Sequence, residues 1–378
     1  MTVTTSTLRP APAPSDPAML PTPALVIDGA VARRNIDRLA AYCRAHGIGL
    51  RPHTKTHKSR FVGNLQLAAG ALGLTVAKVG EAEVMAKAGE PVDLLMAYPA
   101  VDAARTARLA RLAGDGPVSV GLDTAPAAEA LSAAAAAAGT TIGVLVDLDV
   151  GFGRTGVGSP SMAVDLAMLV DRLPGLRLDG IMCYPGQVKM PPADQGPVLA
   201  AIAALLADAI DRFDRAGLAR RIVSGGSTPT AYQSHLIPQC TEVRPGTSVY
   251  ADMNIVRGGF GTLADCAARV VCTVVSDAVP GQVVLDAGSK TLTSDLCGPA
   301  PQSGHGHVVE YPEAVIHRLT EEHGQVDVAR CATRPRVGER VTVIPNHVCP
   351  CVNLQDVVWW HEGDTLTALP VDARGRLS

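Results

Sequence analysis

The sequence predicts an α/β protein in which a (β/α)8 barrel of the TIM type precedes a C-terminal β domain. Eight short β-like runs recur between residues 49 and 250, and Ala/Leu-rich helical stretches separate them. After about residue 260 the chain changes to Val/Thr-rich runs. Polar residues stand in phase at the ends of the predicted strands. Strands that alternate with helices indicate a parallel sheet, and eight units favour a closed barrel over the alternative, an open doubly wound sheet.

The eight predicted barrel strands are short runs rich in apolar and β-branched residues. They cover residues 49–53, 73–78, 93–98, 118–123, 141–149, 178–184, 220–226 and 241–250. The clearest intervening helices are predicted over residues 103–112, 125–138 and 193–216, where alanine and leucine dominate.

The two ends of the chain lie outside this repeat. We expect residues 1–23 to be a mobile tail and residues 24–260 to form the barrel. Residues 24–28 read as a strand that could instead join the β domain, and the helix over residues 31–46 has Asp28 as its candidate N-cap. Residues 261–378 are the predicted β domain, with strands expected at 268–276, 282–286, 340–344 and 357–360.

Composition restricts the class of protein. With 378 residues and 47% apolar content, the chain can bury a large core. A formal charge of −3 without a Lys/Arg block argues against a nucleic-acid or polybasic membrane surface. Residues 1–23 lack the features of a signal peptide, so we expect a cytoplasmic protein. Nine scattered cysteines favour reduced core thiols over a disulfide framework.

Polar residues at the predicted strand ends form the candidate active site, because barrel enzymes assemble their sites there. For any single residue, a solvated strand end is the alternative, but eight strand ends in phase favour a site. The residues are His53, Lys55, Lys78, Tyr98, Asp123, Asp147, Asp149, Arg154, Tyr184, the turn over residues 225–230, and Tyr250.

The turn after the seventh strand is a candidate phosphate site, because barrels often bind phosphate there through loop amides and hydroxyls. Gly225 and Gly226 allow close backbone approach, and Ser227 and Thr228 add hydroxyl donors. An ordinary Gly/Ser/Thr-rich loop is the alternative.

Lys55 lies in RPHTKTHK, just beyond the first predicted strand. If it points into the barrel mouth near other cations, its amine pKa falls and it can form a Schiff base with an aldehyde cofactor such as pyridoxal phosphate. A basic surface cluster is the alternative, and Lys58 and Lys78 are the fallback candidates for the reactive amine.

The C-terminal motif PNHVCPC is a candidate metal site, because His347 and Cys349 stand two residues apart and can face one side. This pair suits Zn²⁺ with open positions for water or substrate, although a structural zinc site uses more ligands. Buried thiols beside a loop histidine are the alternative, and Cys351 could replace or join Cys349.

Five motifs in this order resemble the D-threonine aldolase and D-serine dehydratase family, a relative of the alanine racemase type of pyridoxal enzyme. They are RPHTKTHK, GGSTPT, TEVRPG, EEHG and PNHVC, and the resemblance covers roughly residues 22 to 375. It implies that Lys55 carries pyridoxal 5'-phosphate, that the turn binds its phosphate, and that His347 and Cys349 bind a divalent metal, Zn²⁺ or Mn²⁺. It also implies a homodimer in which one subunit's β domain closes the other's barrel mouth. By position we add His53, Arg154, Tyr184 and Tyr250 to the cofactor contacts.

Within this family the resemblance favours dehydration over aldol cleavage. His347-x-Cys349 and GGSTPT resemble the dehydratases, and the segment from Tyr184 to Gln187 lacks the histidine of the aldolases. The predicted activity is a lyase reaction on D-threonine, D-serine or 3-hydroxy-D-aspartate. An aldolase is the first alternative and a metal-free amino-acid racemase the second, while a non-catalytic pyridoxal-phosphate carrier would usually lack the large β domain.

Overall fold

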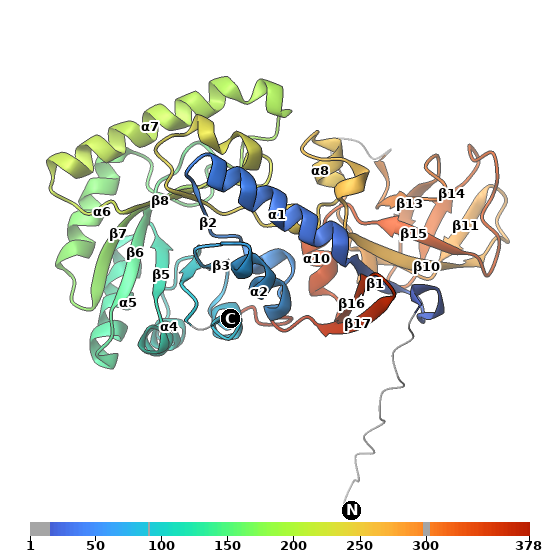
Figure 1. Cartoon of the computed structure of the whole chain (residues 1–378), viewed down its shortest axis with the longest axis horizontal. Coiled ribbons are helices and arrows are strands. Elements are labelled where there is room, and N and C mark those ends of the chain that lie inside the picture. Colours follow the sequence, from blue (N-terminus) through green and yellow to red (C-terminus); the bar gives the residue numbers. More distant parts are fainter. Residues whose placement is uncertain (1–15, 90, 298–302) are drawn as a thin grey trace, which may run out of the picture.

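The computed structural model describes residues 16–89, 91–297 and 303–378. Figure 1 shows two parts, a sheet surrounded by helices and, beside it, a domain made mainly of strands, with α1 (Gly29–Ala45) running between them. Asp28 caps α1 as predicted, because its carboxylate accepts a hydrogen bond of 3.0 Å from the amide of Val31.

The first part is the predicted barrel, and its strands are all parallel. They are β2 (Gly49–Leu50), β3 (Leu74–Val76), β4 (Leu94–Met96), β5 (Val118–Leu122), β6 (Ile142–Asp147), β7 (Leu176–Met182), β8 (Ile222–Gly225) and β9 (Glu242–Val243). Their order is β2-β9-β8-β7-β6-β5-β4-β3. A parallel bridge between His53 and Thr75 and a backbone hydrogen bond from Leu72 to Leu50 join the two ends of this path. The TIM-type barrel fold is therefore confirmed.

Helices cover the outside of the barrel. They are α2 (Arg60–Ala68), α3 (Val79–Met85), α4 (Ala103–Asp115), α5 (Ala125–Ala138), α6 (Pro160–Arg172) and α7 (Gly196–Arg215). The alanine-rich α5 matches its predicted range, because Pro126 opens the helix and Gly139, with φ of 66°, ends it in the left-handed conformation. Between β8 and β9 there is only the 3₁₀ helix η4 (Ala231–Leu236), so the last crossover is shorter than the regular pattern predicts.

The second part is a nine-stranded sheet with the order β13-β14-β11-β10-β1-β16-β17, to which β15 and β12 are added beside β10. Its strands are β1 (Ala24–Asp28), β10 (Ala268–Ser276), β11 (Gln282–Leu285), β12 (His307–Val308), β13 (Val315–Leu319), β14 (Gly324–Asp327), β15 (Arg340–Ile344), β16 (Val357–Glu362) and β17 (Thr365–Pro370). Because β1 lies between β10 and β16, the described part of the chain first adds a strand to the β domain, then forms the barrel and returns to the β domain. The short helices α8 (Met253–Arg257), α9 (Ser289–Leu292) and α10 (Val348–Asn353) complete the fold.

The predicted mobile tail over residues 1–23 differs from the structure at residues 16–23. Residues 1–15 lie outside the described residues, but residues 16–23 pack against the β domain. Leu20 is fully buried, Arg340 donates hydrogen bonds to the carbonyls of Pro17 and Leu20, and the Thr22 hydroxyl donates to Asp286 at 2.5 Å. An apolar side chain with a burial site across the chain explains the difference.

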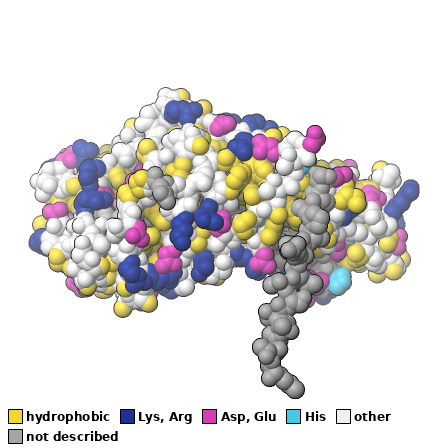
Figure 2. Space-filling model, turned by 60° about the horizontal axis from the view of Figure 1, so that its bottom comes forward, with side chains coloured by type: hydrophobic (Ala, Val, Ile, Leu, Met, Phe, Trp, Pro, Cys, Tyr) yellow, Lys and Arg dark blue, Asp and Glu magenta, His cyan; other side chains and the backbone are white. Residues whose placement is uncertain are grey.

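The remaining expectations from composition can be compared with the structure. All nine cysteines are free thiols. Acidic and basic side chains are interspersed on the face that Figure 2 shows. Among the described residues, no helix has the length and apolar character to cross a membrane.

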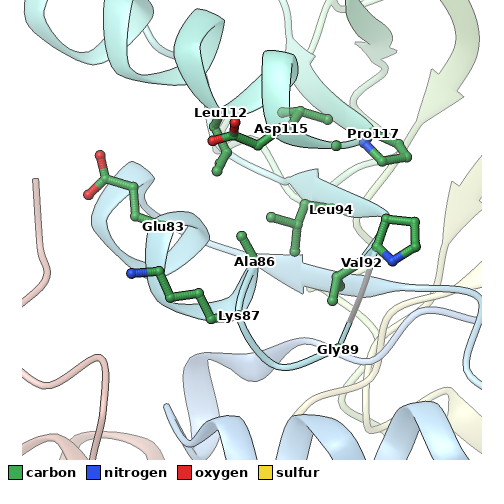
Figure 3. Close-up of a pocket in the computed structure, with 12 residues that line it drawn as sticks. Glu83, Ala86, Lys87, Gly89, Val92, Leu94, Leu112, Asp115 and Pro117 are labelled. Carbon is green, nitrogen blue, oxygen red and sulfur yellow. The ribbon is translucent and has the colours of Figure 1, made fainter.

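Two cavities lie at opposite ends of the barrel strands. A cavity of about 680 Å³ lies where β4 and β5 begin, between the end of α3 and the C-terminal end of α4. Figure 3 shows Ala86 and Leu94 facing Leu112 across it, with Glu83 and Lys87 at its edge. None of the predicted site residues lines this cavity. The larger cavity, of about 1170 Å³, lies at the C-terminal ends of the strands.

Candidate active site

The larger cavity brings together most of the predicted site residues. Those that line it are His53, Lys55, Tyr98, Asp147, Arg154, Tyr184, Gly226, Ser227, Thr228 and His347. Gly225, Tyr250, Cys349, Lys78, Asp123 and Asp149 are not in the lining. Since the lining combines residues from barrel strands with His347 of the β domain, the cavity spans the junction of the two parts.

Lys55 is held at the cavity by the segment around it. It lies in the 3₁₀ helix η2 (Thr54–Thr56), and the His53 imidazole accepts a hydrogen bond of 3.3 Å from its amide. The Thr54 hydroxyl donates to the carbonyl of Thr75 at 3.1 Å, which ties the segment to β3. Burial, the Lys55 ammonium and the Arg244 guanidinium hold the pKa of His53 well below its usual range, so its ring is neutral and can accept.

The fallback lysines have other partners. Lys58 is 5% exposed and pairs with Glu81 at 3.0 Å, and the Lys78 ammonium lies 3.6 Å from the centroid of the Tyr98 ring. Neither lysine lines the cavity. Lys189, on the loop after β7, does line it and was not anticipated from the sequence. Of the three lysines considered from the sequence, Lys55 is the one that faces the cavity.

The turn after β8 is a preformed cradle. Gly226 has φ of 78°, and a Cβ there would lie 2.9 Å from Cβ of Val243. The Ser227 amide donates to Oγ1 of Thr230 at 3.1 Å, and the hydroxyls of the two residues are also 3.1 Å apart. Ser227 and Thr228 line the cavity, whereas Gly225 lies behind the turn, where a Cβ would meet Cys240 Sγ at 2.7 Å. A glycine that no side chain can replace and two lining hydroxyls suit a phosphate group.

The loop after β6 brings Arg154 over an aromatic pair. Its guanidinium lies 4.6 Å from the centroid of the Tyr184 ring and 5.2 Å from that of Phe152. Asp149 accepts hydrogen bonds from the amides of the residues at 151–153, and Asp123 accepts one from the Gly156 amide at 2.9 Å. These two carboxylates therefore shape the loop that carries Arg154.

Asp147 supports the same loop from within the cavity, because its carboxylate accepts a hydrogen bond of 2.9 Å from the Thr155 hydroxyl. Burial raises the pKa of Asp147, although this hydrogen bond opposes the shift.

Tyr250 does not take the predicted place in the cavity. Strand β9 ends at Val243, after which Pro245 and the 3₁₀ helix η5 (Thr247–Val249) turn the chain away. Tyr250 is 1% exposed and packs in the core that the barrel shares with β1 and β10. Burial raises the pKa of its hydroxyl. The assignment of Tyr250 to the cofactor is therefore not supported by its position.

Arg244 is a cavity residue that the sequence reasoning missed. It follows β9, is 7% exposed, and donates hydrogen bonds to Ser224 Oγ at 2.5 Å and to the carbonyl of Cys183 at 2.8 Å. Burial lowers the pKa of Arg244. A charged residue at the end of the predicted eighth strand was the available signal, because buried arginines are rare without a specific role.

The candidate metal pair lies at the start of α10. Asp252 accepts a hydrogen bond of 3.0 Å from the Val348 amide, and Asp295 contacts His347 Nδ1 at 2.8 Å. Cys349 Sγ lies 3.2 Å from Oγ1 of Thr56. Burial lowers the pKa of His347, but the Cys349 thiol and the Asp295 carboxylate outweigh it and raise the pKa to about 9. The imidazole and the thiol thus interact directly.

The donor set of this pair fits a metal with open positions. Within residues 16–89, 91–297 and 303–378, no group of three or more His, Cys, Asp or Glu side chains is arranged to hold an ion. Cys351 is fully buried and points to the carbonyl of Thr291, with Sγ at 3.1 Å, so it does not join Cys349. Imidazole nitrogen and thiolate sulfur are donors that Zn²⁺ prefers, with water or substrate completing the shell.

Comparisons with known proteins identify the family of the chain. Residues 27–254 match the family model "Alanine racemase, N-terminal domain", and residues 267–360 match "Putative serine dehydratase domain". The chain is 33% identical to a D-threonine aldolase of Arthrobacter sp. over 97% of each chain. It is 34% identical to a D-threo-3-hydroxyaspartate dehydratase of Delftia sp. (strain HT23), over 87% of this chain and 91% of that one.

A solved structure is similar to this chain over almost its whole length. The crystal structure of D-threonine aldolase from Filomicrobium marinum superposes with a TM-score of 0.87 at 30% identity, over 95% of this chain and 97% of that chain. The order of the two matched domains is that of the barrel and the β domain. The chain therefore belongs to the D-threonine aldolase and D-serine dehydratase family of pyridoxal-phosphate-type lyases, with the alanine racemase-like fold.

Proposed function

We propose that the protein is a pyridoxal-phosphate- and divalent-metal-dependent lyase that dehydrates D-3-hydroxy-α-amino acids to a 2-oxo acid and ammonia. The observation that carries the proposal is that Lys55, the turn with Ser227 and Thr228, and His347 all line one cavity. The names of the two relatives above give D-threonine and D-threo-3-hydroxyaspartate as their substrates. D-Serine, D-threonine and 3-hydroxy-D-aspartate are the candidate substrates.

The residues of the cavity fit pyridoxal phosphate. The cradle at Gly226 and the hydroxyls of Ser227 and Thr228 would hold the phosphate, and Lys55 would be the attachment point. When bound, this cofactor supplies a conjugated ring that takes up the electron pair released at Cα. With the cofactor bound, the amine of Lys55 would be the base that removes the proton from Cα. Arg154 and Tyr184 would contact the cofactor from the loops after β6 and β7.

His347 and Cys349 would hold the divalent metal, Zn²⁺ or Mn²⁺. A metal held there would supply a Lewis acid for the hydroxyl on Cβ, which would make that hydroxyl a better leaving group. Thr56, next to Lys55, contacts Cys349. This contact supports placing Cα and Cβ of one substrate between the two groups.

The choice between dehydration and aldol cleavage depends on the proton of the Cβ hydroxyl. Aldol cleavage needs a base for it, whereas dehydration needs only the Cα base that Lys55 supplies. Among the described residues, the imidazoles that line the cavity are His53, which accepts from the Lys55 amide, and His347, the candidate metal ligand. The lack of a further imidazole in this lining supports dehydration over an aldol cleavage that uses a histidine base.

D-Threonine aldolase activity is the second candidate, and the 33% identity to an aldolase over 97% of each chain favours it. Incubation of the metal-loaded holoenzyme with each of the three D-amino acids separates the reactions. We expect 2-oxo acid and ammonia in equal amounts. Glycine with an aldehyde would establish the aldolase instead, and the L-amino acid as the product would indicate a racemase.

We also propose that the protein is a homodimer, as the family resemblance implies, with the β domain of one subunit at the barrel mouth of the other. Tyr98 and Leu296 line the cavity and are 40% and 49% exposed, which supports a partner at its mouth. Light scattering after size exclusion should give twice the mass of the chain, and a fully active monomer would contradict the proposal.

A further inference from the structure

A series of buried polar side chains crosses the barrel interior and ends at Arg244. Ser224 and Glu242 are direct neighbours across β8 and β9, and the Ser224 hydroxyl donates to Glu242 Oε1 at 2.6 Å. Glu242 is paired with Arg51 at 2.9 Å, and Arg51 in turn pairs with Asp93 at 3.0 Å. Arg51, Ser224 and Glu242 are at most 4% exposed. The interior of the barrel therefore holds a connected polar network.

The chemistry of the three groups determines the direction of each hydrogen bond. A guanidinium can only donate and a carboxylate can only accept, whereas a hydroxyl has one proton and two lone pairs. The proton of Ser224 therefore points to Glu242, and a lone pair of Ser224 Oγ receives Arg244 Nη1 at 2.5 Å. Glu242 thus orients the hydroxyl that holds Arg244.

Arg244 differs from Arg51 in how its charge is balanced. Arg51 contacts two carboxylates, Glu242 and Asp93. Arg244 contacts the neutral Ser224 hydroxyl and a carbonyl, and in the part of the chain that the structure describes no carboxylate forms an ion pair with it. A buried cation that no carboxylate contacts directly is unfavourable, and an acceptor on a ligand in the cavity would offset this cost.

We propose that Ser224, oriented by Glu242, is a positioning residue that holds the Arg244 guanidinium toward the cavity as a contact for the bound cofactor. The hydroxyl holds Arg244 without neutralising it, and Arg244 lines the cavity, so its charge and its remaining donors would be available to a ligand there. The choice of pyridoxal phosphate as the ligand rests on the proposed function.

A double-mutant cycle tests this proposal. The wild type, Ser224→Ala, Arg244→Ala and the double variant are prepared as apoprotein and titrated with pyridoxal phosphate, and both the Kd and the absorbance maximum of the bound cofactor are recorded. We expect Ser224→Ala to raise the Kd about tenfold and to shift the absorbance maximum. In the Arg244→Ala background the same substitution should change neither quantity.

Ser119→Ala is the matched control. Ser119 is also buried on a barrel strand, and its hydroxyl donates to Asp179 at 3.1 Å, beside the cations Arg177 and Arg221. It does not line the cavity. We expect Ser119→Ala to lower thermal stability but to leave the Kd and the spectrum unchanged. Ser224→Cys, of similar size but with a weak acceptor, replaces Ser224→Ala if the alanine variant does not fold, with the same expected direction.

The outcomes separate this proposal from the proposed function. Wild type that does not bind pyridoxal phosphate would overturn the cofactor assignment itself. Wild type that binds it, with equal effects of Ser224→Ala in both backgrounds or no effect in either, would overturn the positioning role alone.

Discussion

The two ends of the cavity are built differently. At the barrel end, the segment with Lys55 and the turn at Gly226 each have several internal hydrogen bonds, and Ser227 is 5% exposed. At the β-domain end, the His347 side chain is 41% exposed, and its partner Asp295 is 46% exposed. The barrel end is a preformed cradle, whereas the β-domain end is more open to solvent at His347 and Asp295. We therefore expect substitutions at the metal end to affect cofactor binding less than substitutions at the cofactor end affect metal binding.

The two ends are nevertheless in contact. Thr56, from the lysine motif, reaches Cys349 Sγ, and Thr247, after β9, lies 3.7 Å from the same sulfur. The barrel therefore helps to hold the metal pair, whereas the contacts around Gly226 come from the barrel alone. The following variants are designed to break or sharpen this asymmetry.

The largest effect is expected at Lys55. Lys55→Ala should lower activity more than about a thousandfold, because the attachment point and the Cα base are lost together. Borohydride reduction of the wild type followed by peptide mapping should place the cofactor on Lys55. Labelling at Lys58, Lys78 or Lys189 would show that the assignment is wrong.

The metal pair should separate activity from cofactor binding. We expect His347→Ala or Cys349→Ala to abolish lyase activity while the visible spectrum of the bound cofactor stays almost intact. Chelation of the wild type should have the same effect, and Zn²⁺ or Mn²⁺ should restore the wild type but neither variant.

Cys351→Ala is the control for the metal pair, because Cys351 points to the carbonyl of Thr291. We expect this substitution to leave activity nearly unchanged. Full activity of protein that has been verified to be free of metal would contradict the metal site and would favour the racemase alternative.

The cradle should affect cofactor retention. A charge-assisted hydrogen bond contributes roughly 1.5 to 3 kcal/mol, so Thr228→Ala should weaken pyridoxal phosphate binding by roughly ten- to a hundredfold. Ser227→Ala should weaken it too, but it also removes the contact with Thr230 and so loosens the turn. Equilibrium titration measures both, and unchanged affinity in both variants would contradict the phosphate site.

The smallest effect is expected at the contact between the two ends. Thr56→Val should weaken metal affinity by about tenfold, because it removes the hydroxyl beside Cys349, whereas Thr56→Ser should retain wild-type affinity. Competition with a chromogenic chelator measures the metal Kd. Equal affinities of the valine and serine variants would show that the hydroxyl does not support the metal pair.

The local pattern of the sequence predicted much of the fold. The elements α5, β1, β10 and β15 have their predicted bounds, and all eight barrel strands occur where expected. The sequence also pointed to four residues that line the cavity, Lys55, Ser227, Thr228 and His347, because each stands in a short motif next to a predicted strand or in the predicted β domain. Periodicity and turn composition act over a few residues, and such features can be read from sequence alone.

Only the tertiary structure decided how distant segments meet. Several features join residues that are 20 or more positions apart. They are the pairing of β1 with β10 and β16, the burial of Leu20 and Tyr250, the contact between Thr56 and Cys349, and the hydrogen bond from Arg244 to Ser224. A side chain of the same type can face a core, a cavity or solvent, and the choice depends on which partner the folded chain brings to it. Local pattern therefore determined the elements and the motifs, whereas long-range packing and hydrogen bonding determined which of their side chains reach the cavity.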